Sequence, residues 1–299
     1  MLSEVVFLLS ENAMVKERLS CGEACRMLRA QGFAAEVHKA AELADELLSG
    51  RDGLLVLTDD PARLSSLKEQ GVPVIAYRHE GCADLPFSGA LYVVEEPQEI
   101  DADSYIKVYQ RAAGEPWEIL RTERLLLRET TVADIDRLYE IYGDPDMTLY
   151  LEGLFENPAD EMRYMEDYIR NVYHLLGFGV WTVIEKKSGD IIGRAGYSIR
   201  AGFDRPEIGF LIGKPWQGKG FAKEAVEAVL AYGRELLGFT EVQALVKEGN
   251  DVSVHLLESL GFRVRETVEI EEDIYGGVYP SAAVGRARKG AYKEMYVCL

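Results

Sequence analysis

The chain has 299 residues, which predicts about two domains at roughly 100–200 residues per domain. It carries 33 basic and 51 acidic side chains, a net charge of −18, and both its first 120 residues and the remainder are acidic. Such charge repels phosphate backbones and disfavours nucleic-acid binding. No apolar run reaches the roughly 18–20 residues of a membrane span, and the start MLSEVVFLLSENAMVKER lacks a secretory signal pattern, so we expect a cytoplasmic protein without a membrane partner.

The four cysteines do not make a disulfide framework at this length. Cys21 and Cys25 lie four residues apart on a predicted helix, with no histidine or third cysteine nearby. We therefore expect two reduced thiols rather than a metal or redox pair.

Residues 1–112 alternate between predicted strands and predicted helices. The expected strands are VVFLL (5–9), 33–37, LLVLT (54–58), VPVIAY (72–77) and ALYVVE (90–95), and the expected helices are 12–31, 39–48 and 61–70. We expect Asp59 and Asp60 to stabilise the start of the third helix, with Pro61 as its first residue. Strands separated by helices imply crossovers, so we predict a small, doubly wound α/β domain with a parallel sheet.

Residues 113–120, which include Gly114 and Pro116, form a predicted linker, and residues 121–299 form a second domain of α+β type. Its expected elements are a strand at 124–129, helices at 131–142 and 158–176, the hairpin GVWTVIEK–IIGRAGYSI, the strand EIGFLI (207–212), a helix at 221–237, a strand at 241–247 and a helix at 251–260. Gly189 suits the left-handed position of the hairpin loop.

The glycine-rich segment QGKGFA (217–222) lies between a predicted strand and a predicted helix. Two residues without a Cβ allow backbone N–H groups to turn inward, and the start of the helix aims further unpaired N–H groups and a positive dipole end at the same place. This arrangement suits a phosphate or pyrophosphate group. A plain glycine turn is the structural alternative, since the spacing matches neither G-x-x-x-x-G-K-[ST] nor G-x-G-x-x-G.

In its context this segment resembles the acetyl-coenzyme A signature Q-x-x-G-x-A of GNAT-type N-acetyltransferases, in their RimJ/RimL-like branch. The stretches TERLLLRETTVADIDRLYEIY, FGVWTVIEKKSGDIIGRAGYSI and EVQALVKEGNDVSVHLLESLGF resemble other family segments in the family's order, over about residues 120–265. The resemblance implies a mixed, twisted sheet that is splayed between its fourth and fifth strands. It also implies direct transfer of an acetyl group from acetyl-coenzyme A to a primary amine, with no metal.

The resemblance further implies a set of residues that bind the cofactor. The family's fourth strand commonly carries a bulge that frees backbone groups for pantetheine, and the N-x-x-S positions contact the same arm. The corresponding residues are Phe210, Leu211 and Ile212 on the strand, Gln217, Gly218, Lys219, Gly220, Phe221 and Ala222 for the pyrophosphate, and Asn250 and Ser253 for N-x-x-S. Asn250 can also act as a helix N-cap.

Glu207 is the candidate general base, because an amine arrives as ammonium and must lose a proton before it attacks a thioester. The structural alternative is a solvated carboxylate at a strand edge. Relatives often use a helical tyrosine to protonate the leaving thiolate, but this chain has Leu257 at that position. His255, Tyr197 and Tyr275 are the alternatives, unless the thiolate leaves without an acid.

Tyr150 and Glu152 lie between the first two helices of the second domain. The resemblance places this loop beside the acceptor cleft, so we expect both residues to contact the amine, with an ordinary connector as the alternative. The acceptor is a protein N-terminus or a small molecule, and the sequence does not distinguish between the two.

The first domain loosely resembles part of a haloacid-dehalogenase-like fold in LLVLTDDPARLSSLKEQGVPVIAY and ALYVVEE. Its first strand, VVFLLSEN, lacks the D-x-D-x-[TV] nucleophile motif, so we expect no phosphatase activity. A regulatory, substrate-orienting or dimerising role stays open, and a homodimer with it. A second hypothesis for the whole chain is a non-catalytic module that binds coenzyme A, for which Leu257 is the only support.

Overall fold

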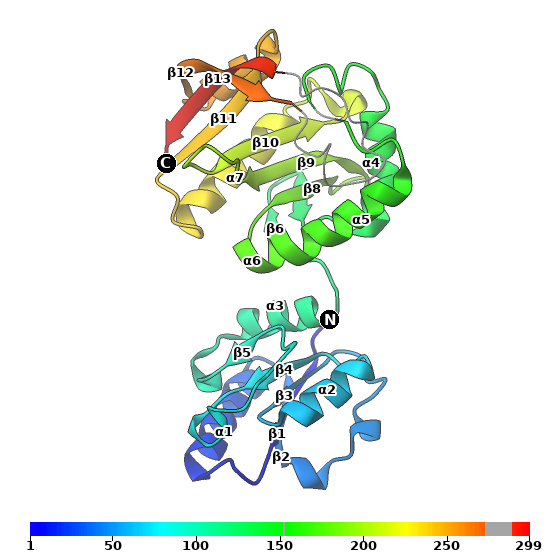
Figure 1. Ribbon diagram of the computed structural model, residues 1–299, viewed down its shortest axis with the longest axis vertical. Helices are drawn as coiled ribbons and strands as arrows, with labels where there is room; N and C mark the ends of the chain where they lie inside the picture. Colours follow the sequence, from blue (N-terminus) through cyan, green and yellow to red (C-terminus); the bar gives the residue numbers. More distant parts are fainter. Residues whose placement is uncertain (152, 273–288) are drawn as a thin grey trace. The chain divides into compact units, whose positions relative to one another are not determined.

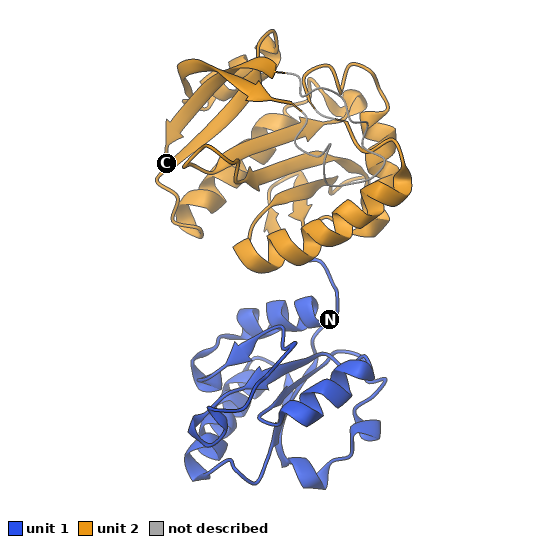
Figure 2. Ribbon diagram, viewed as in Figure 1, with its two compact units in different colours: residues 1–117 blue, residues 118–299 orange. Residues whose placement is uncertain are grey.

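The structure is a computed structural model that describes residues 1–151, 153–272 and 289–299. The chain divides into two compact units, Met1–Trp117 (unit 1) and Glu118–Leu299 (unit 2), coloured separately in Figure 2.

Unit 1 contains a parallel sheet in the order β2-β1-β3-β4-β5 (Figure 1). The strands are β1 (Glu4–Leu9), β2 (Ala34–Lys39), β3 (Leu54–Thr58), β4 (Val74–Tyr77) and β5 (Val93–Val94). Helices α1 (Val15–Ala30) and α3 (Ala102–Ala112) pack on one face of the sheet, and α2 (Pro61–Glu69) packs on the other. This arrangement confirms the predicted doubly wound parallel sheet.

The start of α2 follows the prediction in part. Asp60 is its N-cap, and its carboxylate accepts hydrogen bonds from the backbone N–H groups of Ala62 and Arg63. The expectation for Asp59 is wrong, because its side chain is fully buried and hydrogen-bonds Ser10 and His79 instead of the helix. A carboxylate that faces the interior cannot act on the exposed N–H groups of a helix start.

Two other predictions for unit 1 fail. The expected helix at 39–48 is replaced by two short 3₁₀ turns, Ala40–Glu42 and Asp45–Leu47. There the Arg63 guanidinium donates to the carbonyl oxygens of Ala40 and Leu43, so a side chain satisfies groups that a helix would pair. The strand expected at 90–95 shortens to β5, and α3 was not predicted.

Unit 2 contains a mixed sheet in the order β12-β13-β11-β10-β9-β8-β7-β6, and among its described strands β10 and β11 form the one parallel pair. Its strands are β6 (Glu118–Arg121), β7 (Leu125–Arg128), β8 (Val180–Glu185), β9 (Ile191–Ser198), β10 (Glu207–Ile212), β11 (Glu241–Lys247), β12 (Arg263–Glu271) and β13 (Lys289–Cys298). The helices are α4 (Ile135–Tyr142), α5 (Pro158–Tyr168), α6 (His174–Leu176), α7 (Phe221–Glu235) and α8 (Asp251–Ser259), with a π-helical turn at Ile169–Tyr173. This mixed sheet confirms the predicted α+β class.

Helices α7 and α8 pack against the main core of this sheet, while α4 and α5 form smaller clusters with other side chains. Leu211 of β10 packs against Ile141 and Met147, so the odd-numbered side chains of β10 face α4. The side chain of Asp134, just before α4, is buried and accepts hydrogen bonds from both terminal nitrogens of Arg128 at 2.6 and 2.7 Å. This pair ties the start of α4 to β7.

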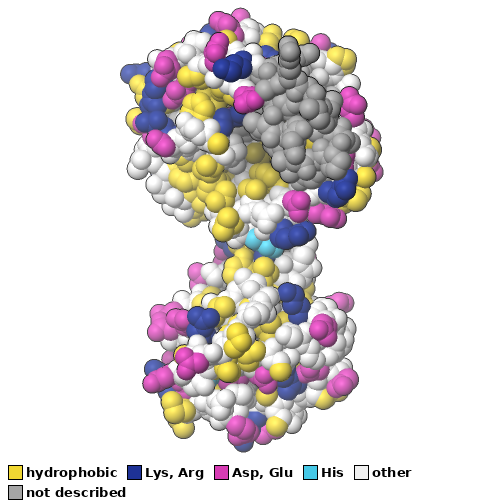
Figure 3. Space-filling view, viewed as in Figure 1, with side chains coloured by type: hydrophobic (Ala, Val, Ile, Leu, Met, Phe, Trp, Pro, Cys, Tyr) yellow, Lys and Arg dark blue, Asp and Glu magenta, His cyan; other side chains and the backbone are white. Residues whose placement is uncertain are grey.

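Acidic and basic side chains are interspersed on the face of the molecule that Figure 3 shows. Among the residues that the structure describes, no helix combines the length and the apolar character needed to cross a bilayer.

Candidate active site

Strands β10 and β11 separate soon after they meet. Along its other edge β10 pairs with β9 at every residue, but with β11 its register has a single pair, Glu207 with Gln243. The two parallel strands therefore diverge beyond this pair, which confirms the predicted splay.

The divergence leaves backbone groups of β10 without a neighbouring strand. The carbonyl of Pro206 accepts a hydrogen bond from the N–H of Gln243 at 3.0 Å, so it points toward β11. Backbone groups of alternate residues share one strand edge, so those of Phe210 and Ile212 point into the gap. The bulge expected at 210–212 is wrong, since the pairing with β9 runs one to one. The splay, rather than a bulge, leaves these groups without a partner strand.

The segment after β10 turns into the N-terminus of α7 through two left-handed glycines. Gly218 has φ +72° and Gly220, the N-cap of α7, has φ +82°, and no described side chain caps the helix. A left-handed backbone is costly for residues that carry a Cβ, so glycine suits both positions. The uncapped N–H groups and the positive end of the helix dipole provide an anion site.

Two side chains hold this loop in place. Gln217 donates from Nε2 to the carbonyl of Ile212 at 2.8 Å, which ties the loop to the end of β10. Arg124 donates from Nη1 to the carbonyl of Lys219 at 2.9 Å and pairs through Nε with Glu224 at 2.6 Å. The loop is therefore braced at both ends.

A cavity of about 430 Å³ lies between this loop, β10 and the start of α8. Eleven of the predicted site residues line it: Tyr150, Phe210, Leu211, Ile212, Gln217, Gly218, Gly220, Phe221, Ala222, Asn250 and Ser253. Lys219 and Glu207 are not on its wall, and Glu152 lies outside the described residues.

Asn250 is the N-cap of α8, as its second predicted role required. Its Oδ1 accepts a hydrogen bond from the backbone N–H of Ser253 at 3.2 Å, which starts α8. Because both residues also line the cavity, the cap fixes the position of this wall.

Glu207 lies where β10 and β11 still pair, and it is only 9% exposed. Its Oε2 accepts a hydrogen bond from Nε of Arg200 at 2.7 Å. The carboxylate is thus a buried member of an ion pair, not a solvated strand-edge group.

The candidate proton donors lie in different environments. Leu257 is fully buried in the core, whereas Leu256, the residue before it on α8, lines the cavity. His255 is exposed and does not line the cavity. Tyr197 is buried and donates to the carbonyl of Val229 at 2.9 Å, while burial raises its pKa. Tyr275 lies outside the described residues.

Sequence reasoning missed two polar side chains on the same sheet. Gln243 is fully buried, and neither its Nε2 nor its Oε1 has a partner among the described residues. As the register partner of Glu207, it faces the same side of the sheet. Arg194 of β9 has a buried, unpartnered Nε and lies opposite Leu211. Polar residues in a strand of alternating polarity are predicted to face solvent. The sequence pattern therefore did not indicate that polar atoms of Gln243 and Arg194 are buried.

Among residues 1–151, 153–272 and 289–299, no group of three or more His, Cys, Asp and Glu side chains is placed to hold a metal ion.

Unit 2 is similar in sequence to known proteins. The family described as "Acetyltransferase (GNAT) domain" matches residues 124–263. "Uncharacterized N-acetyltransferase p20" of Bacillus licheniformis is 34% identical over 150 residues, which cover 49% of this chain and 83% of that protein. "[Ribosomal protein uS5]-alanine N-acetyltransferase" of Escherichia coli (strain K12) is 35% identical over 155 residues, which cover 48% of this chain and 77% of that protein. The solved structure of a putative ribosomal-protein-serine acetyltransferase from Vibrio cholerae is 16% identical with a TM-score of 0.47, over 61% of this chain and 98% of that chain.

Three observations indicate the same family: the splayed sheet, the glycine loop at the N-terminus of α7, and a relative matched over 83% of its length. GNAT enzymes transfer acyl groups from acyl-coenzyme A to amines, and acetyl-coenzyme A is the donor of the acetyltransferases among them. The chain therefore belongs to the GNAT acetyltransferases, with RimJ/RimL-like relatives.

Proposed function

We propose that unit 2 transfers the acetyl group of acetyl-coenzyme A directly to a primary amine, with Glu207 as the general base. The observation that carries the proposal is the single pairing of Glu207 with Gln243, beyond which the gap leads to the cavity wall at 210–212. The acceptor is a protein N-terminus or a small amine.

In this proposal the pyrophosphate of the donor binds the N–H groups of residues 217–222. Lys223 and the uncapped start of α7 place positive charge at the cavity, although the chain as a whole is acidic. The pantetheine arm lies along the free edge of β10, where the backbone groups of Phe210 are available. Asn250 and Ser253 form the opposite wall.

Glu207 removes a proton from the ammonium of the acceptor, after which the amine nitrogen bonds to the acetyl carbon and the carbon–sulfur bond breaks. The ion pair with Arg200 occupies Oε2, so Oε1 is the oxygen that receives the proton. Backbone N–H groups on the free edge of β10 stabilise the oxyanion. With Leu257 and Tyr197 both in the core, the thiolate leaves without an acid from these positions.

The test is Glu207→Gln, with Glu235→Gln as the matched control, because Glu235 is an exposed residue at the far end of α7. Release of the coenzyme A thiol is followed with a panel of alanine-initiated peptides and small amines. We expect kcat to fall about 10²–10⁴-fold in Glu207→Gln, with the dissociation constant of coenzyme A unchanged. Equal turnover in the two variants would remove Glu207 from the mechanism.

A further inference from the structure

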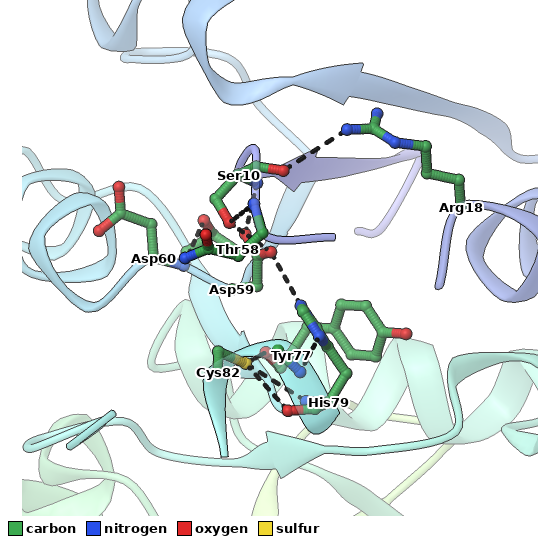
Figure 4. Close-up of polar contacts among 10 residues, drawn as sticks. Ser10, Arg18, Thr58, Asp59, Asp60, Tyr77, His79 and Cys82 are labelled. Carbon is green, nitrogen blue, oxygen red and sulfur yellow. Dashed lines mark hydrogen bonds and ion pairs between the residues drawn. The ribbon is translucent and has the colours of Figure 1, made fainter. Parts of the chain in front are cut away.

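Unit 1 contains polar side chains that the proposed acetyl transfer does not use. Ser10 follows β1, Asp59 follows β3 and His79 follows β4, and Figure 4 shows the three together. In doubly wound folds, ligands bind outside the carboxyl ends of the parallel strands. This edge of the sheet is therefore the place to look for a ligand site in unit 1.

The three side chains form a closed network. Asp59 accepts a hydrogen bond from the N–H of Ser10 at 2.7 Å, and its Oδ2 accepts from Ser10 Oγ at 2.8 Å and from His79 Nε2 at 2.9 Å. His79 Nδ1 accepts from the N–H of Gly81 at 3.1 Å, so the neutral ring carries its proton on Nε2. Both carboxylate oxygens of Asp59 accept these hydrogen bonds. The carboxylate fixes the ring of His79.

A cavity of about 750 Å³ lies beside this network, between α1 and the segments that follow β4 and β5. Tyr77 and His79 both line it, with ring centroids 5.2 Å apart. His79, which the network holds in place, and Tyr77 therefore form an aromatic wall of the cavity.

Glu17 of α1 also lines this cavity and is only 3% exposed. Its Oε2 is buried and has no hydrogen-bond partner among the described residues. A buried charge without a partner is strongly unfavourable. A cationic ligand in the cavity would supply the partner that Oε2 lacks.

The charges around the cavity indicate which partner fits. Five of its lining side chains are glutamates, whereas Lys16 and Arg78 are its basic ones. Arg78 itself lies 3.9 Å from Glu95, so it is already paired. The excess of carboxylates favours a cation and repels an anion.

We propose that unit 1 binds a small organic cation in this cavity, with an ammonium group of the ligand paired to Glu17. The aromatic wall of Tyr77 and His79 contacts the apolar part of the ligand. This site is separate in sequence from the acetyl-transfer cavity, and it gives unit 1 a binding function for amines.

The test is calorimetric titration of the full chain with 1,4-diaminobutane, with 1,4-butanediol as the neutral control and succinate as the anionic one. Glu17→Gln removes the charge. Leu19→Lys places a tethered ammonium at the cavity, and Leu19 is 62% exposed, so the substitution leaves the core intact. Leu47→Lys is the matched control, because Leu47 is 63% exposed and does not line the cavity.

We expect the diamine to bind and both controls to give no heat in the same range. Affinity for the diamine falls at least tenfold in Glu17→Gln and in Leu19→Lys and is unchanged in Leu47→Lys. If Glu17→Gln does not fold, the affinity of Leu19→Lys for the diamine tests the proposal instead. Preference for succinate, absence of diamine binding, or full binding in Leu19→Lys would overturn the proposal. A signal lost in Glu207→Gln but kept in Leu19→Lys would assign the diamine to unit 2 and overturn it equally.

Discussion

Replacing Gln243 by leucine should raise the stability of the protein and lower its acetyl-transfer activity. The amide of Gln243 is fully buried and neither of its polar atoms has a partner among the described residues. An unsatisfied buried polar group costs about 1–3 kcal/mol, so an apolar side chain of similar size removes that cost. At about 2–4 °C per kcal/mol for a domain of this size, the melting temperature rises by roughly 2–12 °C.

Activity should move in the opposite direction. The amide faces the same side of the sheet as Glu207, so we expect it to hydrogen-bond a reactant at the apex of the gap. Loss of one such bond lowers kcat/KM by about tenfold. The assays are calorimetric unfolding and steady-state acetyl transfer on the same samples.

The control for Gln243→Leu is Thr182→Val, a polar-to-apolar change on β8 in the same sheet. Thr182 is equally buried, but its hydroxyl donates to Asp134 at 3.0 Å, so its loss should lower the melting temperature. If Gln243→Leu also lowered the melting temperature, or raised it without any loss of activity, the reasoning about the unpartnered amide would be refuted.

Three further predictions concern other parts of the chain. Burial opposes ionisation of Asp134, but hydrogen bonds from its arginine, backbone and threonine partners outweigh it and hold its pKa below the ordinary value. Its contribution to stability is therefore present above pH ~4 and lost only as the pH falls further, and Asp134→Asn should lower the free energy of unfolding by about 3–5 kcal/mol in urea titrations at pH 7. Gly220→Ala forces a Cβ onto a φ of +82° and should weaken coenzyme A binding at least about tenfold, or about 1.4 kcal/mol, by calorimetry. Burial raises the pKa of the Cys21 thiol to about 12, so the native chain at pH 8 should give one fast equivalent in a thiol assay, from the exposed Cys298.

Local chemistry in the sequence was enough to predict several elements. The aspartate–proline start of α2, the glycine at 189 and the two glycines before α7 each meet a local backbone requirement that few residue types satisfy. Helix α3 also had a sequence signal that was missed. Asp101 caps this helix by accepting a hydrogen bond from the N–H of Ser104, and the side chains of Tyr105 and Tyr109 share its buried face.

Features that depend on contacts between distant segments could not be predicted in this way. Asp59 stands beside a helix start in the sequence, yet its partners come from the segments that follow β1 and β4. Arg200 binds Glu207 across a loop, and Gln243 lies on β11, between β10 and β13, where it is fully buried. Such environments arise from the tertiary fold, which local spacing does not encode.

The central claim is that the loop at 217–222 binds the diphosphate of a coenzyme A nucleotide, and its most direct test is calorimetric titration with three ligands. Coenzyme A and 3′-dephospho-coenzyme A both carry the diphosphate, whereas pantetheine carries only the arm. We expect the first two to bind within about tenfold of each other and pantetheine to bind at least about 100-fold more weakly, a difference of about 2.7 kcal/mol. Equal affinity for pantetheine and coenzyme A, or no binding of coenzyme A, would contradict the account.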